Sequence, residues 1–98
     1  MKFKMRNANI QIDRNAEIGK NVLLDAGSGK IIIGRSYIGD FVKLHTAGGL
    51  LQIGSNVTIG AFGFVNAAGN VTIGDNVLCA DKVNIVAENH GYIYQRGD

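Results

Sequence analysis

Aliphatic or similar residues recur about every six positions along most of this chain, and this spacing sets the first expectation for its fold. The series runs Ile12, Ile18, Leu24; Ile33, Ile38, Leu44; Ile53, Ile59, Val65; and Ile73, Cys79, Ile85. An amphipathic helix needs apolar residues at offsets of three and four, and an amphipathic strand needs them at offsets of two. The observed spacing fits neither as a continuous element, but it fits very short strands separated by tight corners.

Three such steps make a larger repeat of about twenty residues. A stretch rich in small residues follows each third step, in turn DAGSGK, HTAGGL, NAAGNV and VAENHG, and one step is short because Ile38 follows Ile33 by only five residues. We predict one all-β domain over residues 1–98, a triangular parallel β-helix of about four turns, or rungs. The predicted rungs are residues 12–32, 33–52, 53–72 and 73–92, with a tail at 93–98.

The residues expected at the corners agree with a coil. Small side chains can fill the corners beside the inward aliphatics, and asparagine tolerates a positive φ at low cost. The small residues are Ala16, Val22, Val42, Val57, Val77 and Val83, and the asparagines are Asn15, Asn21, Asn56 and Asn76. The chain has no proline, as expected where each rung donates hydrogen bonds to its neighbour.

Composition limits the classes of partner. A monomer of 98 residues buries only about two thirds of its unfolded surface, so we expect the chain to oligomerise. The net charge of +2 comes without a block of like charges, which argues against nucleic acid and anionic membranes as partners. No stretch approaches the ~20 apolar residues of a membrane span, and the N-terminus lacks a signal-peptide core. We therefore expect a cytoplasmic protein.

Two local features have structural interpretations. Lys2, Lys4 and Arg6 alternate with Phe3 and Met5, which is typical of a charged first strand that protects a sheet edge from unwanted pairing. Cys79 is the only cysteine, so an internal disulfide is excluded. We expect Cys79 to be a small buried apolar residue.

The hexads IGSNVT, IGDNVL and IGKNVL resemble those of the hexapeptide-repeat acyltransferases, over roughly residues 10–92. The resemblance implies a left-handed β-helix, although parallel crossovers are normally right-handed. The run NVTIGDNVLCADKVNIVAENHG, residues 70–91, is similar to the stretch of the galactoside, maltose and polysaccharide-modifying O-acetyltransferases that ends at their catalytic histidine. This similarity puts His90 at the catalytic position.

The resemblance implies acetyl-CoA as co-substrate, a sugar or xenobiotic hydroxyl as acceptor, and no metal. His90 would take the hydroxyl proton, since imidazole has a pKa near the working pH. Glu88, Asn89, Asn66 and His45 are the candidates for support of His90 or contact with the acceptor. The resemblance also implies a homotrimer with the site between neighbouring coils, and two trimers could stack end to end.

Two departures from the family pattern matter. In the galactoside and maltose enzymes an acceptor-binding asparagine follows the aliphatic of the second step in the preceding rung, where this chain has Gly60. This difference favours the polysaccharide or xenobiotic branch. The family also continues into further rungs after the histidine loop, whereas this sequence ends at Asp98. We therefore expect an incomplete donor site, and slow acetyl transfer at most by this chain alone.

Two other functions stay open at this point. The chain could be a non-catalytic trimeric scaffold or small-ligand binder, with His45 in the exposed polar row that any solenoid shows and with Glu88 and Asn89 as ordinary loop residues. A metal-dependent hydrase like the γ-class carbonic anhydrases, which share the fold, would need three histidines. Only His45 and His90 are present.

Overall fold

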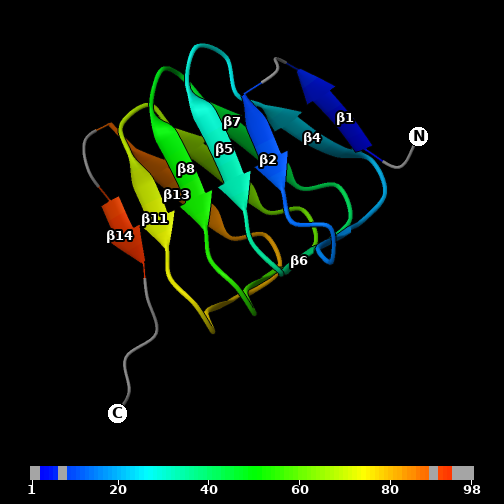
Figure 1. Cartoon of the computed structure of the whole chain (residues 1–98). Coiled ribbons are helices and arrows are strands. Elements are labelled where there is room, and N and C mark those ends of the chain that lie inside the picture. The colour runs from blue at the N-terminus through cyan, green and yellow to red at the C-terminus, as the bar shows by residue number, and fades with distance from the viewer. Residues whose placement is uncertain (1–2, 7–8, 89–90, 94–98) are drawn as a thin grey trace.

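The computed structural model describes residues 3–6, 9–88 and 91–93, and in these ranges all regular secondary structure is β-strand (Figure 1). The strands form three parallel sheets, one on each side of a coil. Sheet A has the order β1 (Phe3–Arg6), β4 (Val22–Asp25), β7 (Lys43–Thr46), β10 (Phe64–Ala67), β13 (Asn84–Ala87). Sheet B has the order β2 (Ile10–Ile12), β5 (Lys30–Ile33), β8 (Leu50–Ile53), β11 (Val71–Ile73), β14 (Gly91–Ile93). Sheet C has the order β3 (Glu17–Ile18), β6 (Tyr37–Ile38), β9 (Thr58–Ile59), β12 (Leu78–Cys79).

The path of the chain is a left-handed coil. In Figure 1 the chain descends along sheet B on the near side, crosses below through sheet C, and rises along sheet A on the far side. It advances at the same time from the N-terminal end on the right to the C-terminal end on the left. The fold is therefore the left-handed parallel β-helix of about four turns that the sequence and its resemblance predicted.

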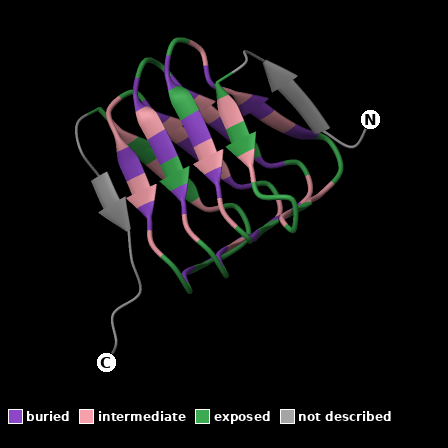
Figure 2. Cartoon of the chain, in the orientation of Figure 1, coloured by how far each residue is buried: buried purple, intermediate pink, exposed green. Residues whose placement is uncertain are grey.

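The aliphatic residues stack from rung to rung as their spacing predicted. Ile12 pairs with Ile33, Ile33 with Ile53, and Ile53 with Ile73 along sheet B. The inward side chains of the middle rungs are fully buried, while Ile12, Ile18 and Ile85 nearer the two ends are only partly buried (Figure 2). Hydrophobic burial is thus concentrated in one column that runs along the coil axis.

Both ends of the coil match or extend the predicted rungs. β1 forms the edge of sheet A and pairs with β4, so the expected first edge strand is confirmed. Ile93, which the predicted boundaries put in the tail, belongs instead to β14 and pairs with Ile73. The isoleucine ladder of sheet B therefore continues by one more residue in the same register. The extent of the domain over residues 1–98 stays a prediction.

The recurring Ile-Gly pair has a structural cause in the next rung. The Asp40 carboxylate accepts a hydrogen bond from Lys20 N at 2.9 Å, and it lies where a side chain on Gly19 would be. The same arrangement joins Asp75 to Gly54. Glycine leaves room for a carboxylate that pairs with an N–H at the corner, which would otherwise lack an acceptor.

The corner asparagines have the predicted positive φ with one exception. Asn21, Asn56 and Asn76 have positive φ as predicted, but Asn15 does not. At Asn15 the prediction was wrong because Asp13 closes this corner, accepting from Asn15 N with its carboxylate and from Ala16 N with its carbonyl.

The corner after sheet C also has positive φ at Phe41, Phe62 and Lys82, and the two phenyl rings stack with centroids 5.0 Å apart. Stacking of about 0.5–1.5 kcal/mol offsets part of this backbone strain.

The short step between Ile33 and Ile38 changes the corner between β5 and β6. Tyr37 pairs with Glu17 in the rung before and with Thr58 in the rung after, while Ile33 pairs with Ile53. The second rung therefore has one residue fewer between these pairs than the third rung, and it has no counterpart of Asn56. The buried Ser36 hydroxyl donates to Gly54 O at 2.7 Å and accepts from Val57 N at 2.9 Å. This hydroxyl satisfies two main-chain groups beside the shortened corner.

Replacing Ser36 with alanine is expected to destabilise the coil by about 1–3 kcal/mol, because Val57 N then lacks an acceptor in a buried position. Urea unfolding followed by circular dichroism measures the change. Ser55→Ala is the matched control, since Ser55 is an exposed serine at the corresponding corner of the next rung. Equal stability of the two variants would show that the Ser36 hydroxyl is not needed.

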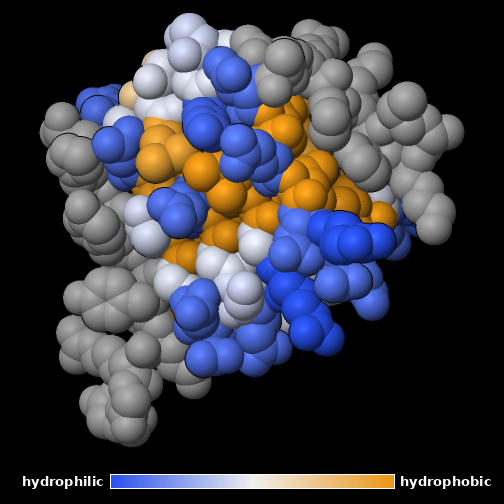
Figure 3. All heavy atoms as spheres, viewed as in Figure 1, coloured by the Kyte–Doolittle hydropathy of each residue, from blue (hydrophilic) through white to orange (hydrophobic). Residues whose placement is uncertain are grey.

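The outer surface is mixed in polarity. Figure 3 shows apolar atoms along the middle of the sheet B face with hydrophilic residues on both sides. No helix in the described part of the chain is long and apolar enough to cross a membrane. Cys79 is buried and forms no disulfide, as predicted, and this burial raises the pKa of its thiol.

Candidate functional site

A row of polar side chains runs along the outer face of sheet A. Asp25 pairs with His45, and His45 pairs with Asn66, on adjacent strands β4, β7 and β10. Val86 on β13 continues the row as an exposed apolar residue. The structure therefore brings together His45 and Asn66, two of the residues that the sequence analysis selected, with Asp25 beside them as the repeat predicts.

Asp25 is positioned by its own turn. One carboxylate oxygen, Oδ1, accepts a hydrogen bond from Gly27 N at 3.1 Å, and the other, Oδ2, lies 3.6 Å from His45 Nδ1. The two side chains are only 22% and 32% exposed. A carboxylate beside one ring nitrogen orients the ring.

Two atoms of this row lack a hydrogen bond. His45 Nδ1 and Asn66 Oδ1 are both buried and have no partner within hydrogen-bonding distance. Buried polar atoms are normally paired, so these two unpaired atoms mark the row as a candidate polar site. Its chemistry is that of a general acid or base with an adjacent carboxylate.

The residues predicted near the C-terminus are placed only in part. Glu88 is exposed and directly follows β13. Asn89 and His90 lie outside the residues that the structure describes. His45 is two rungs from Glu88, since it lies on β7 and Glu88 follows β13, so these two side chains do not belong to one cluster. In the described ranges no three His, Cys, Asp or Glu side chains form a group that could hold a metal ion.

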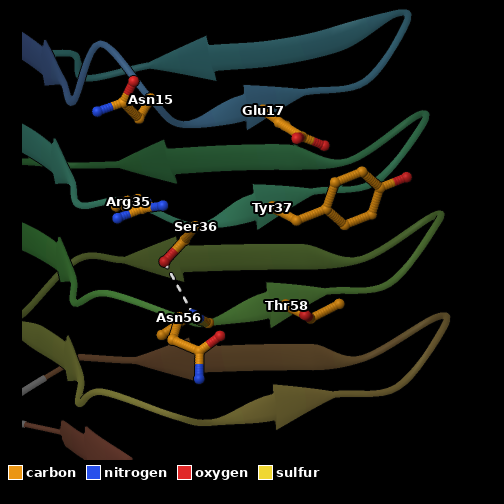
Figure 4. Close-up of a pocket in the computed structure, with 8 residues that line it drawn as sticks. Asn15, Glu17, Arg35, Ser36, Tyr37, Asn56 and Thr58 are labelled. Atoms are coloured by element: carbon orange, nitrogen blue, oxygen red, sulfur yellow. Dashed lines mark hydrogen bonds between the residues drawn. The ribbon is translucent and has the colours of Figure 1, made fainter.

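A pocket at the shortened corner was not predicted. It has a volume of about 250 Å³, and Figure 4 shows polar side chains of three successive rungs around it. The lining residues are Asn15, Glu17, Arg35, Ser36, Tyr37, Asn56, Val57 and Thr58. The sequence signal was the five-residue step before Ile38, which indicated an irregular corner but not which side chains would meet there.

Gly60 has a clear structural reason. The Asp81 carboxylate lies where a side chain on Gly60 would be, and it accepts a hydrogen bond from Ala61 N at 3.0 Å. An asparagine cannot occupy this position without moving Asp81. The acceptor contact expected of the galactoside and maltose enzymes is therefore absent at this place in the coil.

The fold and its stacked repeats define a left-handed β-helix protein, and the comparison with known proteins gives an enzymatic relative. The probable UDP-3-O-acylglucosamine N-acyltransferase 2, mitochondrial, of Arabidopsis thaliana is 37% identical to this chain over 95 residues. The match covers 87% of this chain, and it covers 29% of the relative's length. No protein-family model matches the chain, and no solved structure matches it. The chain is thus similar to an acyltransferase.

Proposed function

We propose that this chain is the β-helix of an acyltransferase that transfers an acetyl group from acetyl-CoA to a hydroxyl of a sugar or xenobiotic acceptor. The single observation that carries the proposal is its 37% identity to an N-acyltransferase. The stacked hexads support the same class. Because the chain spans 29% of that relative's length, the donor, the acceptor and the reaction all belong to the proposal.

In the proposed reaction His90 is the general base. Its imidazole takes the proton from the acceptor hydroxyl as the hydroxyl oxygen attacks the thioester carbonyl. The tetrahedral oxyanion then collapses, the carbon–sulfur bond breaks, and the CoA thiolate leaves and takes up a proton. Glu88 and Asn89 support the imidazolium or contact the acceptor. No covalent enzyme intermediate and no metal are needed.

The acceptor is the finer part of the proposal. The blocked position at Gly60 argues against the galactoside and maltose type of acceptor contact. The name of the Arabidopsis relative describes transfer to the nitrogen of an acylglucosamine, so an amino sugar is the main competing acceptor. A sugar alcohol, an amino sugar and a hydroxylated xenobiotic should therefore be assayed in parallel.

Assembly is part of the same proposal. We propose a homotrimer, in which each site lies between neighbouring coils, and stacked trimers are the larger form of this assembly. The partly buried aliphatics in the outer rungs, such as Ile18 and Ile85, would gain further burial if trimers pack end to end. Light scattering of the purified chain measures the assembly.

Isothermal titration calorimetry of the purified chain with acetyl-CoA tests the donor part of the proposal. We expect saturable binding of acetyl-CoA, with a dissociation constant on the order of micromolar to millimolar. CoA should compete with acetyl-CoA for the same site. If the folded oligomer gives no heat of binding with acetyl-CoA or with CoA, the result contradicts the acyltransferase proposal and favours the non-catalytic scaffold.

A further inference from the structure

The pocket at the shortened corner results from one missing residue. In the rungs before and after it, Asn15 and Asn56 occupy the same place in the corner, and Asn56 Nδ2 donates to Asn76 Oδ1 at 2.7 Å. The second rung has no asparagine there, because Ile38 follows Ile33 after five residues. The row of amides is therefore interrupted, and the pocket lies at the interruption (Figure 4).

The side chains around this gap are free to bind a ligand. Glu17 and Arg35 both line the pocket and are exposed, and in the described residues neither forms an ion pair or a side-chain hydrogen bond. Tyr37 is 43% exposed at the same place. Figure 4 shows Arg35 and Tyr37 in the second rung, between Glu17 of the rung before and Thr58 of the rung after.

The pocket contains both donors and acceptors. Arg35 offers up to five N–H donors, Glu17 offers acceptors only, and Thr58 offers a hydroxyl that can do both. Asn56 keeps its Oδ1 as an acceptor, since its Nδ2 is already used. A ligand that is rich in hydroxyl groups matches this set, because each hydroxyl both donates and accepts.

Size and polarity narrow the ligand class further. Pockets for drug-sized molecules are mostly apolar and measure about 300–1,000 Å³, whereas this one is polar and measures about 250 Å³. A phosphate would place its charge beside the Glu17 carboxylate, and a metal cation would meet the Arg35 guanidinium, so both are disfavoured. The Tyr37 ring adds an apolar face with a polar tip, which suits the C–H face of a sugar ring.

We propose that this corner pocket is a saccharide-binding subsite for a single sugar ring. Arg35 donates to ring or hydroxyl oxygens, Glu17 and Asn56 accept from neighbouring hydroxyls, and Tyr37 packs against the ring face. This site lies at the corner between sheets B and C, whereas Glu88 lies on the loop between sheets A and B. The inference goes beyond the proposed acyl transfer and does not depend on it.

The test is a nuclear magnetic resonance titration of the ¹⁵N-labelled full chain with methyl glucoside and with N-acetylglucosamine, without any acyl donor. We expect saturable shifts of the main-chain amides of Glu17, Arg35, Tyr37 and Thr58 for at least one sugar. Arg35→Gln should weaken binding about tenfold. Arg14→Gln is the matched control, because Arg14 is the exposed arginine at the same position in the preceding rung and does not line the pocket.

A second variant restores the regular repeat. Insertion of one asparagine between Arg35 and Ser36 gives the second rung its missing residue and should abolish the sugar-dependent shifts in a folded coil. If this variant does not fold, the comparison of Arg35→Gln with Arg14→Gln still tests the proposal. The proposal is overturned if neither sugar gives saturable shifts, if inorganic phosphate saturates the same amides more tightly, or if Arg14→Gln weakens binding as much as Arg35→Gln.

Discussion

Acyl transfer by the His90→Ala variant is expected to be about 100- to 10,000-fold slower than that of the unaltered chain, since this range is typical of the loss of a general base. Without the imidazole, the acceptor hydroxyl must attack while it still holds its proton. Release of CoA thiol from acetyl-CoA, measured with a sugar acceptor at a high concentration of both substrates, reports the rate. Binding of acetyl-CoA should be unchanged, because the base acts on the acceptor.

The other histidine provides the control for this prediction. His45→Ala removes an imidazole that lies beside Asp25 on the face of sheet A, and it should leave the rate of CoA release unchanged. A large loss in His45→Ala and none in His90→Ala would move the catalytic base to the polar row of Asp25, His45 and Asn66. Equal rates of CoA release in the unaltered chain, His90→Ala and His45→Ala would mean that neither histidine is the base.

Replacing Leu44 with alanine is expected to lower the free energy of unfolding by about 2–5 kcal/mol, the usual range for leucine-to-alanine changes in a core. Leu44 is completely buried and pairs with Leu24 and Val65 in the rungs on either side. Its removal leaves a cavity that the stiff ladder cannot close. Because small domains are stable by only about 5–15 kcal/mol, this one change removes a large share of the total.

Chemical denaturation followed by circular dichroism measures the Leu44 effect. Leu78→Ala is the control, because Leu78 lies on β12 and is 78% exposed. Its change should stay within about 0.5 kcal/mol. If the two variants are equally stable, the axial column of aliphatics does not supply the main stability of the coil. A large loss in Leu78→Ala alone would indicate that an interface covers β12.

Much of the fold could be predicted because a coil repeats one local geometry. The spacing of Ile12, Ile33, Ile53 and Ile73 fixes the register of sheet B, since a parallel ladder places equivalent residues side by side. The corner asparagines were predicted for the same reason, with Asn15 as the exception. Phe41 and Phe62 were not predicted at positive φ, because a bulky residue rarely adopts this conformation alone. Their stacking across two rungs offsets part of the strain, and Lys82 has the same positive φ at the equivalent corner of the next rung, so the conformation belongs to the corner itself.

Much less of the candidate site could be predicted. Stacking of His45 with Asn66 follows from the repeat and is confirmed. The approach of Asp25 to His45 Nδ1 depends on how the Gly27 turn holds the carboxylate, which no spacing reveals. His90 stays a prediction from resemblance, and the Arabidopsis relative supports the acyltransferase class without testing that residue.

The sequence by itself determined the sides of the coil, the inward column and the places where the chain turns, because each of these follows from a period that hydrophobic burial and the parallel ladder both require. Only the tertiary structure decided what lies on the outside. One residue fewer before Ile38 brings Glu17, Arg35 and Tyr37 around a pocket with Ser36 at its base. These residues belong to adjacent rungs, and the distances between their side chains depend on how each rung packs on the next.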